Sequence, residues 1–403
     1  MVDFMEDAPQ VREPWVQHSE AALLVVELAR SLHAAGAPSH RLEASVGAVS
    51  RAVGVHAAVF AQPTSVLLEL DGRTCMMRVE PADPALADLV IIDQVARDVE
   101  VGLLSPGLAR QRLGALAAQP APYGRLAIAA AWAGVAGGAA VFFGGGAADV
   151  LAAAALSGLL GLLPGRLGEL LPLLAALVVG LGARLLAQLH PLHVDIVILS
   201  GAIALLPGFT LTVALTEVAT RHLASGTARL AAAGVTFLQL GVGLGLAEAV
   251  SRRLLPPVIV PALNPGSGVV EALAITTAAL SFLVLFRSRW QDLPAVLAVA
   301  FLAVHGTRLG GSLLGPEAAP YLGGLAVGLA ANAHARLRQV PALVLLVPGL
   351  LLLVPGSLGF RGVQALVDSG GDLMDGARMF MVGASLVAGI LTSNALLPPR
   401  RAL

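Results

Sequence analysis

The chain has 403 residues, of which 57% are hydrophobic and only 13% are charged, and its net charge is −1. A net charge near zero argues against a nucleic-acid partner, and the single cysteine, Cys75, excludes an intramolecular disulfide and a cysteine cluster for a metal. Several apolar stretches of about 17 to 25 residues occur in succession, which predicts helices that span a lipid bilayer.

The first 122 residues are more charged than the rest and alternate between helical and strand-like patterns. A helix is expected from Ser19, which can cap it, to Ala35, and a second from Ser39 to Val53. Three short strands and two more helices follow, the strands at 55–60, 65–70 and 75–79 and the helices at 85–101 and 106–118. This pattern predicts a small α+β domain over residues 1–122.

Beyond residue 122 the chain consists of ten apolar runs, five on each side of a proline-rich linker at 252–268. The first five lie within residues 123–251 and cover 126–143, 147–163, 168–189, 194–218 and 227–250. The second five lie within residues 269–403 and cover 269–286, 293–311, 320–337, 340–366 and 376–397. Arginines are more frequent in the short loops on the side of the N-terminal domain, which places that domain in the cytoplasm.

The two membrane halves resemble each other at an offset of 148 residues. This offset aligns Pro207-Gly208 with Pro355-Gly356 and Gly201 with Gly349. An odd number of spans in each half would invert the second copy in the membrane, an arrangement common in secondary transporters. We therefore predict a polytopic α-helical membrane protein with about ten transmembrane helices in two inverted five-helix repeats and an N-terminal cytoplasmic α+β domain.

Each Pro-Gly pair predicts a broken membrane helix. Proline removes a backbone donor and clashes with the preceding turn, and the adjacent glycine frees the backbone further. In lipid, an irregular backbone is tolerated only where protein or a water-filled cavity shelters it. Two such breaks in corresponding halves of a chain indicate the binding site of a transporter.

Two segments carry a resemblance to a known family. The first is Ala35-Gly36-Ala37-Pro38-Ser39-His40-Arg41-Leu42-Glu43, with Gln62-Pro63-Thr64 after it. The second runs from Leu206-Pro207-Gly208 through Thr216-Glu217 and Arg221 to Ser225-Gly226-Thr227-Ala228-Arg229-Leu230. With these segments the chain resembles the threonine/serine exporter family of bacterial membrane proteins. The resemblance implies a multi-pass protein of the bacterial plasma (inner) membrane that exports L-threonine and L-serine, driven by the proton motive force.

A zwitterionic amino acid needs partners for its two charges and, in threonine or serine, for a hydroxyl. A helix that restarts at Pro207-Gly208 or Pro355-Gly356 offers N–H groups to the carboxylate, and unwound carbonyls would bind the ammonium. Polar partners are expected around the breaks and in mid-span, namely Ser200, Thr210, Thr212, Thr216, Gln239 and Ser357. The alternative is that the serines and threonines among them bond back to their own helices.

Proton coupling needs a group that titrates within the field across the membrane, and the candidates are His193, Asp195 and Glu217. Glu217 lies ten residues after Pro207 and Asp195 twelve residues before it, which corresponds to about 15 and 18 Å along a helix. Both carboxylates are therefore expected nearer the membrane surfaces than the midplane. They are interpreted as gates or proton entry points, or as ordinary charges at helix ends.

Two other functions stay open on the sequence alone. The cargo could be another small carboxylate, such as a dicarboxylate, bound by Arg184, Arg221 or Arg229, or the membrane part could anchor a sensing domain. The chain has no ATP-binding loop, hydrolase motif or metal-binding motif, so we expect no enzyme activity, no cofactor and no metal. The expected partners are threonine, serine, protons and the lipid bilayer, and the sequence leaves a homo-oligomer open.

Overall fold

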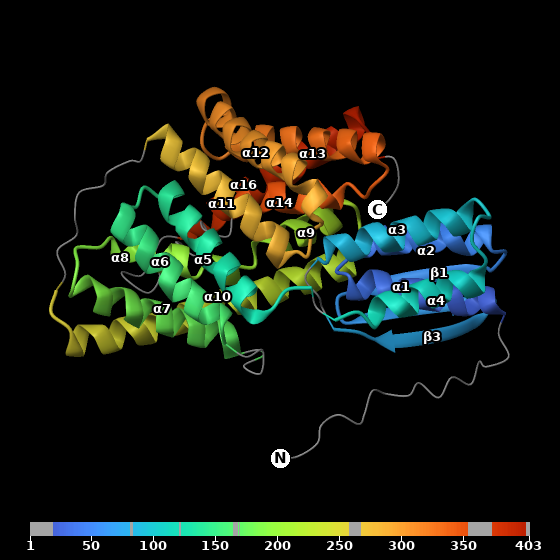
Figure 1. Ribbon diagram of the computed structural model, residues 1–403, viewed down its shortest axis with the longest axis horizontal. Coiled ribbons are helices and arrows are strands. Elements are labelled where there is room, and N and C mark those ends of the chain that lie inside the picture. The colour runs from blue at the N-terminus through green and yellow to red at the C-terminus, as the bar shows by residue number, and fades with distance from the viewer. Residues whose placement is uncertain are drawn as a thin grey trace, which may run out of the picture.

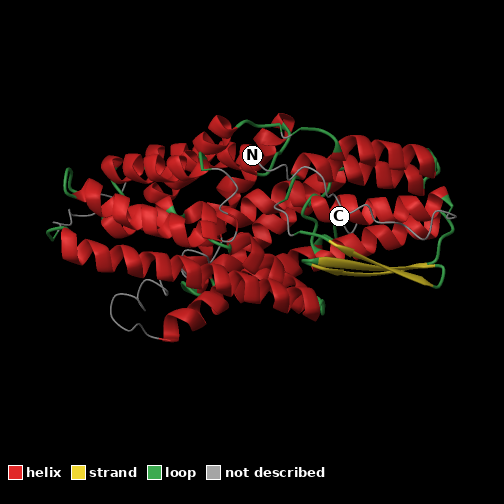
Figure 2. Ribbon diagram, turned by 90° about the horizontal axis from the view of Figure 1, so that it is seen from below, coloured by secondary structure: helices red, strands yellow, loops and turns green. Residues whose placement is uncertain are grey.

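The computed structural model describes residues 19–80, 84–120, 122–163, 168, 170–257, 267–353 and 373–399, with side chains from residue 381 onward in the last range. Helices make up most of it, and a small sheet lies towards one end of its long axis (Figures 1 and 2). The predicted binding residues Pro355, Gly356 and Ser357 lie outside the described residues.

The first seven elements pack together into what we call the N-terminal lobe. They are α1 (Glu20–Ala34), α2 (Ser39–Ala52), β1 (Ala57–Gln62), β2 (Ser65–Leu70), β3 (Arg73–Arg78), α3 (Leu86–Glu100) and α4 (Pro106–Ala117). Each begins and ends within two residues of its predicted bounds, so the predicted helices and strands are confirmed. Ser19 caps α1 as expected, because its hydroxyl accepts a hydrogen bond from the amide of Ala22 at 3.3 Å.

The three strands of the lobe form an antiparallel meander in the order β1-β2-β3. Asp71 and Gly72 close the second hairpin with positive φ values of 49° and 82°, a turn whose twist matches that of the flanking strands. Alternate side chains of β2, those of Val66, Leu68 and Leu70, are buried and join the helices in the core of the lobe.

The remaining elements form the helical bundle. They are α5 (Arg125–Phe142), α6 (Ala147–Gly161), α7 (Leu171–Ala187), α8 (Val194–Gly201), η2 (Ile203–Leu205), α9 (Gly208–Ala219), α10 (Leu223–Leu254), α11 (Gly268–Leu285), η3 (Trp290–Asp292), α12 (Leu293–Leu314), α13 (Ala319–Arg338), α14 (Leu343–Leu353) and α16 (Leu373–Leu396). A helix or a broken helix thus occupies each predicted apolar run within the described residues.

Among the described residues, four helices are long and apolar enough to cross a membrane: α5, α10, α11 and α12 with its preceding turn. The helix α8 qualifies as a fifth span together with the segment Ile203–Ala219, which holds η2 and α9, and the two are bent by 41° at a break after Gly201, six residues before Pro207. Shorter apolar helices accompany them: α6, α7, α14 and the end of α16. The protein is therefore a helical membrane protein with a small three-stranded sheet, and the ten-span inverted repeat and the predicted domain boundaries stay predictions.

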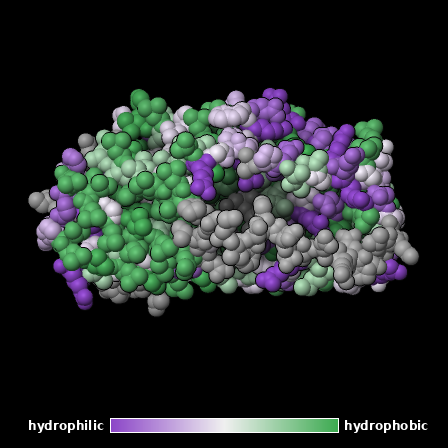
Figure 3. All heavy atoms as spheres, turned by 60° about the horizontal axis from the view of Figure 1, so that its bottom comes forward, coloured by the Kyte–Doolittle hydropathy of each residue, from purple (hydrophilic) through white to green (hydrophobic). Residues whose placement is uncertain are grey.

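The surface of the bundle fits a lipid environment. Figure 3 shows hydrophobic side chains gathered over the part of the molecule that holds the bundle, while hydrophilic ones are frequent towards the N-terminal lobe. Large apolar side chains of α10 such as Leu238, Val242 and Leu246 are exposed on the bundle. Exposed leucine and valine along one helix are stable in hydrocarbon, where no hydrophobic penalty applies.

Close glycine contacts recur in the two halves of the bundle. A Cβ added to Gly201 in α8 would lie 2.8 Å from Val179 Cγ1 in α7, and one added to Gly349 in α14 would lie 2.6 Å from Val327 Cγ1 in α13. Both glycines and both valines are separated by 148 residues, the offset found in the sequence. A side chain at either position would force the facing valine to shift, so glycine permits the close approach of the two helices.

The N-terminal lobe docks on one end of the bundle. The first free amides of α3, those of Leu86 and Ala87, donate to the carbonyls of Phe286 and Arg287 at the end of α11, at 2.9 and 3.1 Å. Leu343 in α14 is buried in the core of the lobe. The lobe and the bundle therefore share a continuous interior at this end.

Candidate functional site at the junction of lobe and bundle

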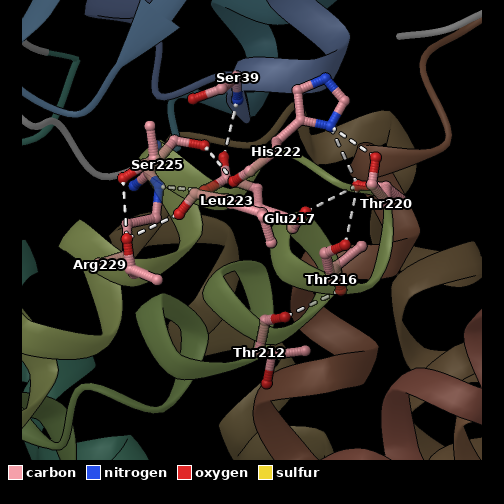
Figure 4. Close-up of polar contacts among 11 residues, drawn as sticks. Ser39, Thr212, Thr216, Glu217, Thr220, His222, Leu223, Ser225 and Arg229 are labelled. Carbon is pink, nitrogen blue, oxygen red and sulfur yellow. Dashed lines mark hydrogen bonds and ion pairs between the residues drawn. The ribbon is translucent and has the colours of Figure 1, made fainter.

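Glu217 joins the lobe to the bundle. It lies near the end of α9, and its carboxylate accepts a hydrogen bond at 2.9 Å from the amide of Ser39, the first residue of α2 (Figure 4). That amide has no acceptor within its own helix, and the positive end of the α2 dipole adds to the attraction. The Glu217 side chain is fully buried, so its charge needs a partner.

Arg229 supplies that partner from α10. Its Nε donates to the second oxygen of Glu217 at 3.1 Å, and only 17% of the Arg229 side chain is exposed. The turn between α9 and α10 brings the two together, because the amides of Arg221 and His222 donate back to the carbonyls of Val218 and Glu217. Arg221 has the left-handed φ of 67° that this turn requires.

A second polar contact links the same elements. His222 begins α10, and its Nε2 lies 3.4 Å from a carboxylate oxygen of Glu43 in α2. The other oxygen of Glu43 accepts from the amide of Ala61 in β1 at 2.8 Å. The rings of His222 and His40 are 5.8 Å apart. The two segments that carry the family resemblance, far apart in the sequence, thus meet at this junction.

A cavity of about 180 Å³, which we call the junction cavity, opens beside this network. The lobe contributes Pro38, His40 and Arg41 to its wall. The bundle contributes polar groups from α9 and α16 and apolar ones from α9, α14 and α16, among them Thr212, Thr216, Thr220, Asn394, Phe209, Leu346 and Leu350. The cavity therefore combines a cation, hydroxyls and an amide with an apolar floor.

The charge state of its two lobe residues follows from burial. Burial, with smaller contributions from Arg41, His222 and Arg229, lowers the pKa of His40 to about 3, so its imidazole is neutral at pH 7. Burial also lowers the pKa of Arg41, to about 10, which leaves the guanidinium protonated. Within the described residues the Nδ1 atom of His40 is buried without a hydrogen-bond partner.

The helix break at Pro207 borders a different cavity, also of about 180 Å³, which we call the break cavity. Its wall is apolar and includes Leu206, Phe142, Phe282 and Leu352. Gly208 contributes to this wall, whereas its neighbour Phe209 contributes to that of the junction cavity. The helices α9 and α14 border both cavities, so the two lie in succession along them.

His193, another predicted site residue, lies at the opposite end of the α8–α9 element and contacts a carboxylate. It precedes α8, and its Nδ1 lies 2.8 Å from Oδ2 of Asp149 in α6. Asp195 is exposed in the first turn of α8. The structure thus separates the predicted titratable residues, with Glu217 at the junction and His193 and Asp195 at the other end.

Comparisons with known proteins give the family. A family model described as threonine/serine exporter matches residues 23–251, and a second, described as Threonine/Serine exporter, ThrE, matches residues 271–396. The first model alone spans more than half of the chain. The chain belongs to the threonine/serine exporter family. Neither the curated proteins nor the solved structures contain a match.

This is a family of transporters and not of enzymes, so the exporter acts on a small-molecule substrate at a membrane. Among the described residues of the exporter, no group of three or more histidine, cysteine, aspartate or glutamate side chains could hold a metal.

The hydroxyls predicted to bind substrate in the exporter have different surroundings. Thr212 and Thr216 donate to the carbonyls of Gly208 and Thr212, at 3.0 and 2.9 Å, as the alternative interpretation held, yet both line the junction cavity. Ser200 is fully buried, and its hydroxyl has no partner among the described residues. Thr210 and Gln239 are partly buried, and neither lines the junction or the break cavity.

Sequence reasoning missed three residues that the exporter places at these sites. His40 and Arg41 stand in the segment that carries the resemblance, but nothing in the sequence showed that α2 would reach α9. Asp149 lies among alanines after Gly144-Gly145-Gly146, and its signal was a carboxylate in the first turn of a membrane helix.

Proposed function

We propose that this exporter moves L-threonine and L-serine out of the cell in exchange for protons, with its N-terminal lobe in the cytoplasm of a bacterium. The junction cavity carries this proposal, because it joins a buried guanidinium to hydroxyl groups at the end of the bundle that the lobe covers. A substrate that leaves the cytoplasm would meet this cavity first.

The groups around the junction cavity match the groups of the proposed cargo. Arg41 would bind the carboxylate through charge-assisted hydrogen bonds. His40, neutral at pH 7, would accept a hydrogen bond from the ammonium. Thr216 and Thr220 would bind the side-chain hydroxyl, since an oxygen that donates to its own helix still accepts from another donor. In this arrangement the substrate binds next to the broken span rather than at its midpoint.

The path outward would lead from the junction cavity to the break cavity. The boundary between the two cavities falls between Gly208 and Phe209 in α9 and between Leu350 and Leu351 in α14. A break at Pro207 lets α9 tilt without stretching a continuous helix. The recurring contacts of Gly201 and Gly349 support a repeat whose halves rock against each other, as in alternating access.

The arginines favour an amino acid over a dicarboxylate. A dicarboxylate carries two negative charges and no ammonium, and Arg184, Arg221 and Arg229 were the candidates to bind it. Arg184 forms an ion pair with Glu248, and Arg229 forms one with Glu217. Arg221 is exposed in the turn after α9 and does not line the junction cavity. None of these three arginines lines the junction cavity, and the single arginine on its wall, Arg41, suits a single carboxylate.

The decisive experiment measures uptake of labelled threonine into liposomes that contain the purified exporter. We expect an acidic lumen to drive accumulation of about tenfold per pH unit for each coupled proton, and a protonophore to abolish it. Unlabelled serine should compete and succinate should not. Threonine accumulation that does not depend on the pH gradient would refute proton exchange. Competition by succinate but not by serine would show that the substrate is a dicarboxylate.

A pair of arginine variants tests the junction cavity. Arg41→Gln should raise KM for threonine roughly 10- to 100-fold, since a hydrogen bond to a charged group contributes about 1.5–3 kcal/mol. Arg51→Gln is the matched control, because Arg51 is exposed on the same helix. Equal KM values for Arg41→Gln and the wild type would refute substrate binding in the junction cavity.

A further inference from the structure

A buried carboxylate–histidine hydrogen bond lies at the end of the bundle away from the N-terminal lobe. Asp149, in the first turn of α6, is 2% exposed, and His193, just before α8, is 8% exposed. One oxygen of Asp149 accepts from the amide of His193 at 2.8 Å. The other faces Nδ1 of His193 and the amide of Gly146, each at 2.8 Å. Asp149 is thus held as an acceptor on both oxygens.

This arrangement leaves one nitrogen of His193 available. A carboxylate that accepts from Nδ1–H fixes the tautomer in which Nε2 carries the lone pair. Nε2 of His193 is buried, and within the described part of the chain it has no hydrogen-bond partner. A buried acceptor without a partner is costly unless a ligand uses it.

Two more buried groups without partners follow at greater depth. Ser157 in α6 and Ser200 in α8 are fully buried, and among the described residues neither hydroxyl has a partner. Both helices start near Asp149 and His193 and pack against each other. Ser157 lies eight residues beyond Asp149 and Ser200 seven beyond His193, so both hydroxyls are about 10 to 12 Å further along their helices. The helix α8 ends one residue after Ser200, and η2 begins at Ile203.

At the offset of 148 residues that relates the two halves in the sequence, Asp149 and His193 have no polar counterparts. Residues 148 positions later are Leu297 and Pro341, which are apolar. The charged and titratable groups on the elements packed against the pair are Arg125 at the start of α5, Arg184 in α7, His190 before α8 and Asp195 in α8. Arg184 is paired with Glu248, and His190 and Asp195 are exposed. The pair is therefore the buried titratable unit of this end within the described residues.

We propose that Asp149 and His193 form the proton-binding site of the exporter on its outer side, an inference that rests on the proposed exchange of substrate for protons. A proton from the external medium binds to the lone pair of Nε2, and the imidazole becomes an imidazolium whose charge Asp149 neutralises. When the α8–α9 element shifts, the imidazolium releases the Nε2 proton to water on the cytoplasmic side, by a route past the hydroxyls of Ser157 and Ser200, and the neutral imidazole is restored. The step transfers one proton and no electrons.

The test separates coupling from transport. In liposomes, Asp149→Asn and His193→Gln should lose the accumulation of threonine that an acidic lumen drives in the wild type. Both should keep the exchange of labelled for unlabelled threonine at equal pH, because exchange needs substrate movement without net proton transfer. The matched control is His190→Gln, which removes an exposed histidine three residues before His193 and should keep both activities.

Three results are decisive. Gradient-driven accumulation in both variants, with a coupled wild type, overturns this proposal and leaves the proposed function intact. A wild type that ignores the gradient overturns the proposed function. If neither variant folds, nuclear magnetic resonance of ¹⁵N-histidine in wild-type liposomes decides: the His193 resonance should titrate with external pH, and a ring that stays neutral from pH 4 to 9 refutes the site.

Discussion

Replacing Glu217 by glutamine should destabilise the contact between the lobe and the bundle by about 3 kcal/mol. The charge of Arg229 would remain with 17% of its side chain exposed, and removing one partner of a buried pair costs about 3–5 kcal/mol. We take the lower end because Arg229 retains some solvent. The amide oxygen of the introduced glutamine can still accept from the Ser39 amide, so this hydrogen bond is not lost.

Equilibrium unfolding in mixed micelles measures this cost, and a double-mutant cycle isolates the pair. The costs of Glu217→Gln and Arg229→Gln should sum to more than the cost of the double variant, and the difference is a coupling energy of about 2 kcal/mol. Glu69→Gln, on the exposed face of β2, is the control and should change stability by less than about 0.5 kcal/mol. Additive costs for Glu217→Gln and Arg229→Gln would refute the pairing.

Three further outcomes are expected. Burial lowers the pKa of His40 to about 3, so the unfolded chain binds a proton at this residue below about pH 6.5 while the folded chain does not. The free energy of unfolding should therefore be highest above pH 6.5 and lower by about 1.4 kcal/mol at pH 5.5. His40→Gln should flatten that part of the pH profile of unfolding. Thr216→Val should raise KM for threonine about tenfold through one lost hydrogen bond, whereas Thr227→Val, on the exposed face of α10, should leave KM unchanged. Arg221→Gly should stabilise the protein by about 1 kcal/mol, since glycine adopts a positive φ without strain; a loss of stability would contradict the turn.

Local structure was the most predictable part of this molecule. The alternation of Val66, Leu68 and Leu70 with exposed residues specifies a half-buried strand, and Asp71-Gly72 specifies a tight hairpin. The extended backbone of Leu206, with φ −65° and ψ 126°, and the start of α9 at Gly208 follow from Pro207. These features depend on neighbours in the chain, so the sequence contains the information that determines them.

The site was less predictable because it is made by distant segments. Ser39 and Glu217 are 178 residues apart, and a carboxylate in a membrane helix has no sequence signal that names its partner. Hydroxyl placement was also ambiguous, since Thr212 and Thr216 could face a cavity or bond back to their own helix, and they do both. The role of Asp149 could not be predicted from the sequence, because its contact with His193 depends on the packing of α6 against α8.

The polar groups would give the predicted repeat a direction. The contacts of Gly201 and Gly349 lie 148 residues apart, and two equivalent halves would favour neither orientation of the proposed rocking motion. The α8–α9 element breaks that symmetry, with His193 bound to Asp149 at one end and Glu217 bound to Ser39 and Arg229 at the other. A proton at the first end and a substrate beside the second would change opposite ends of the same broken helix. Since a ligand shifts an equilibrium only through its differential affinity for two states, this shared element is where the two binding events can be coupled.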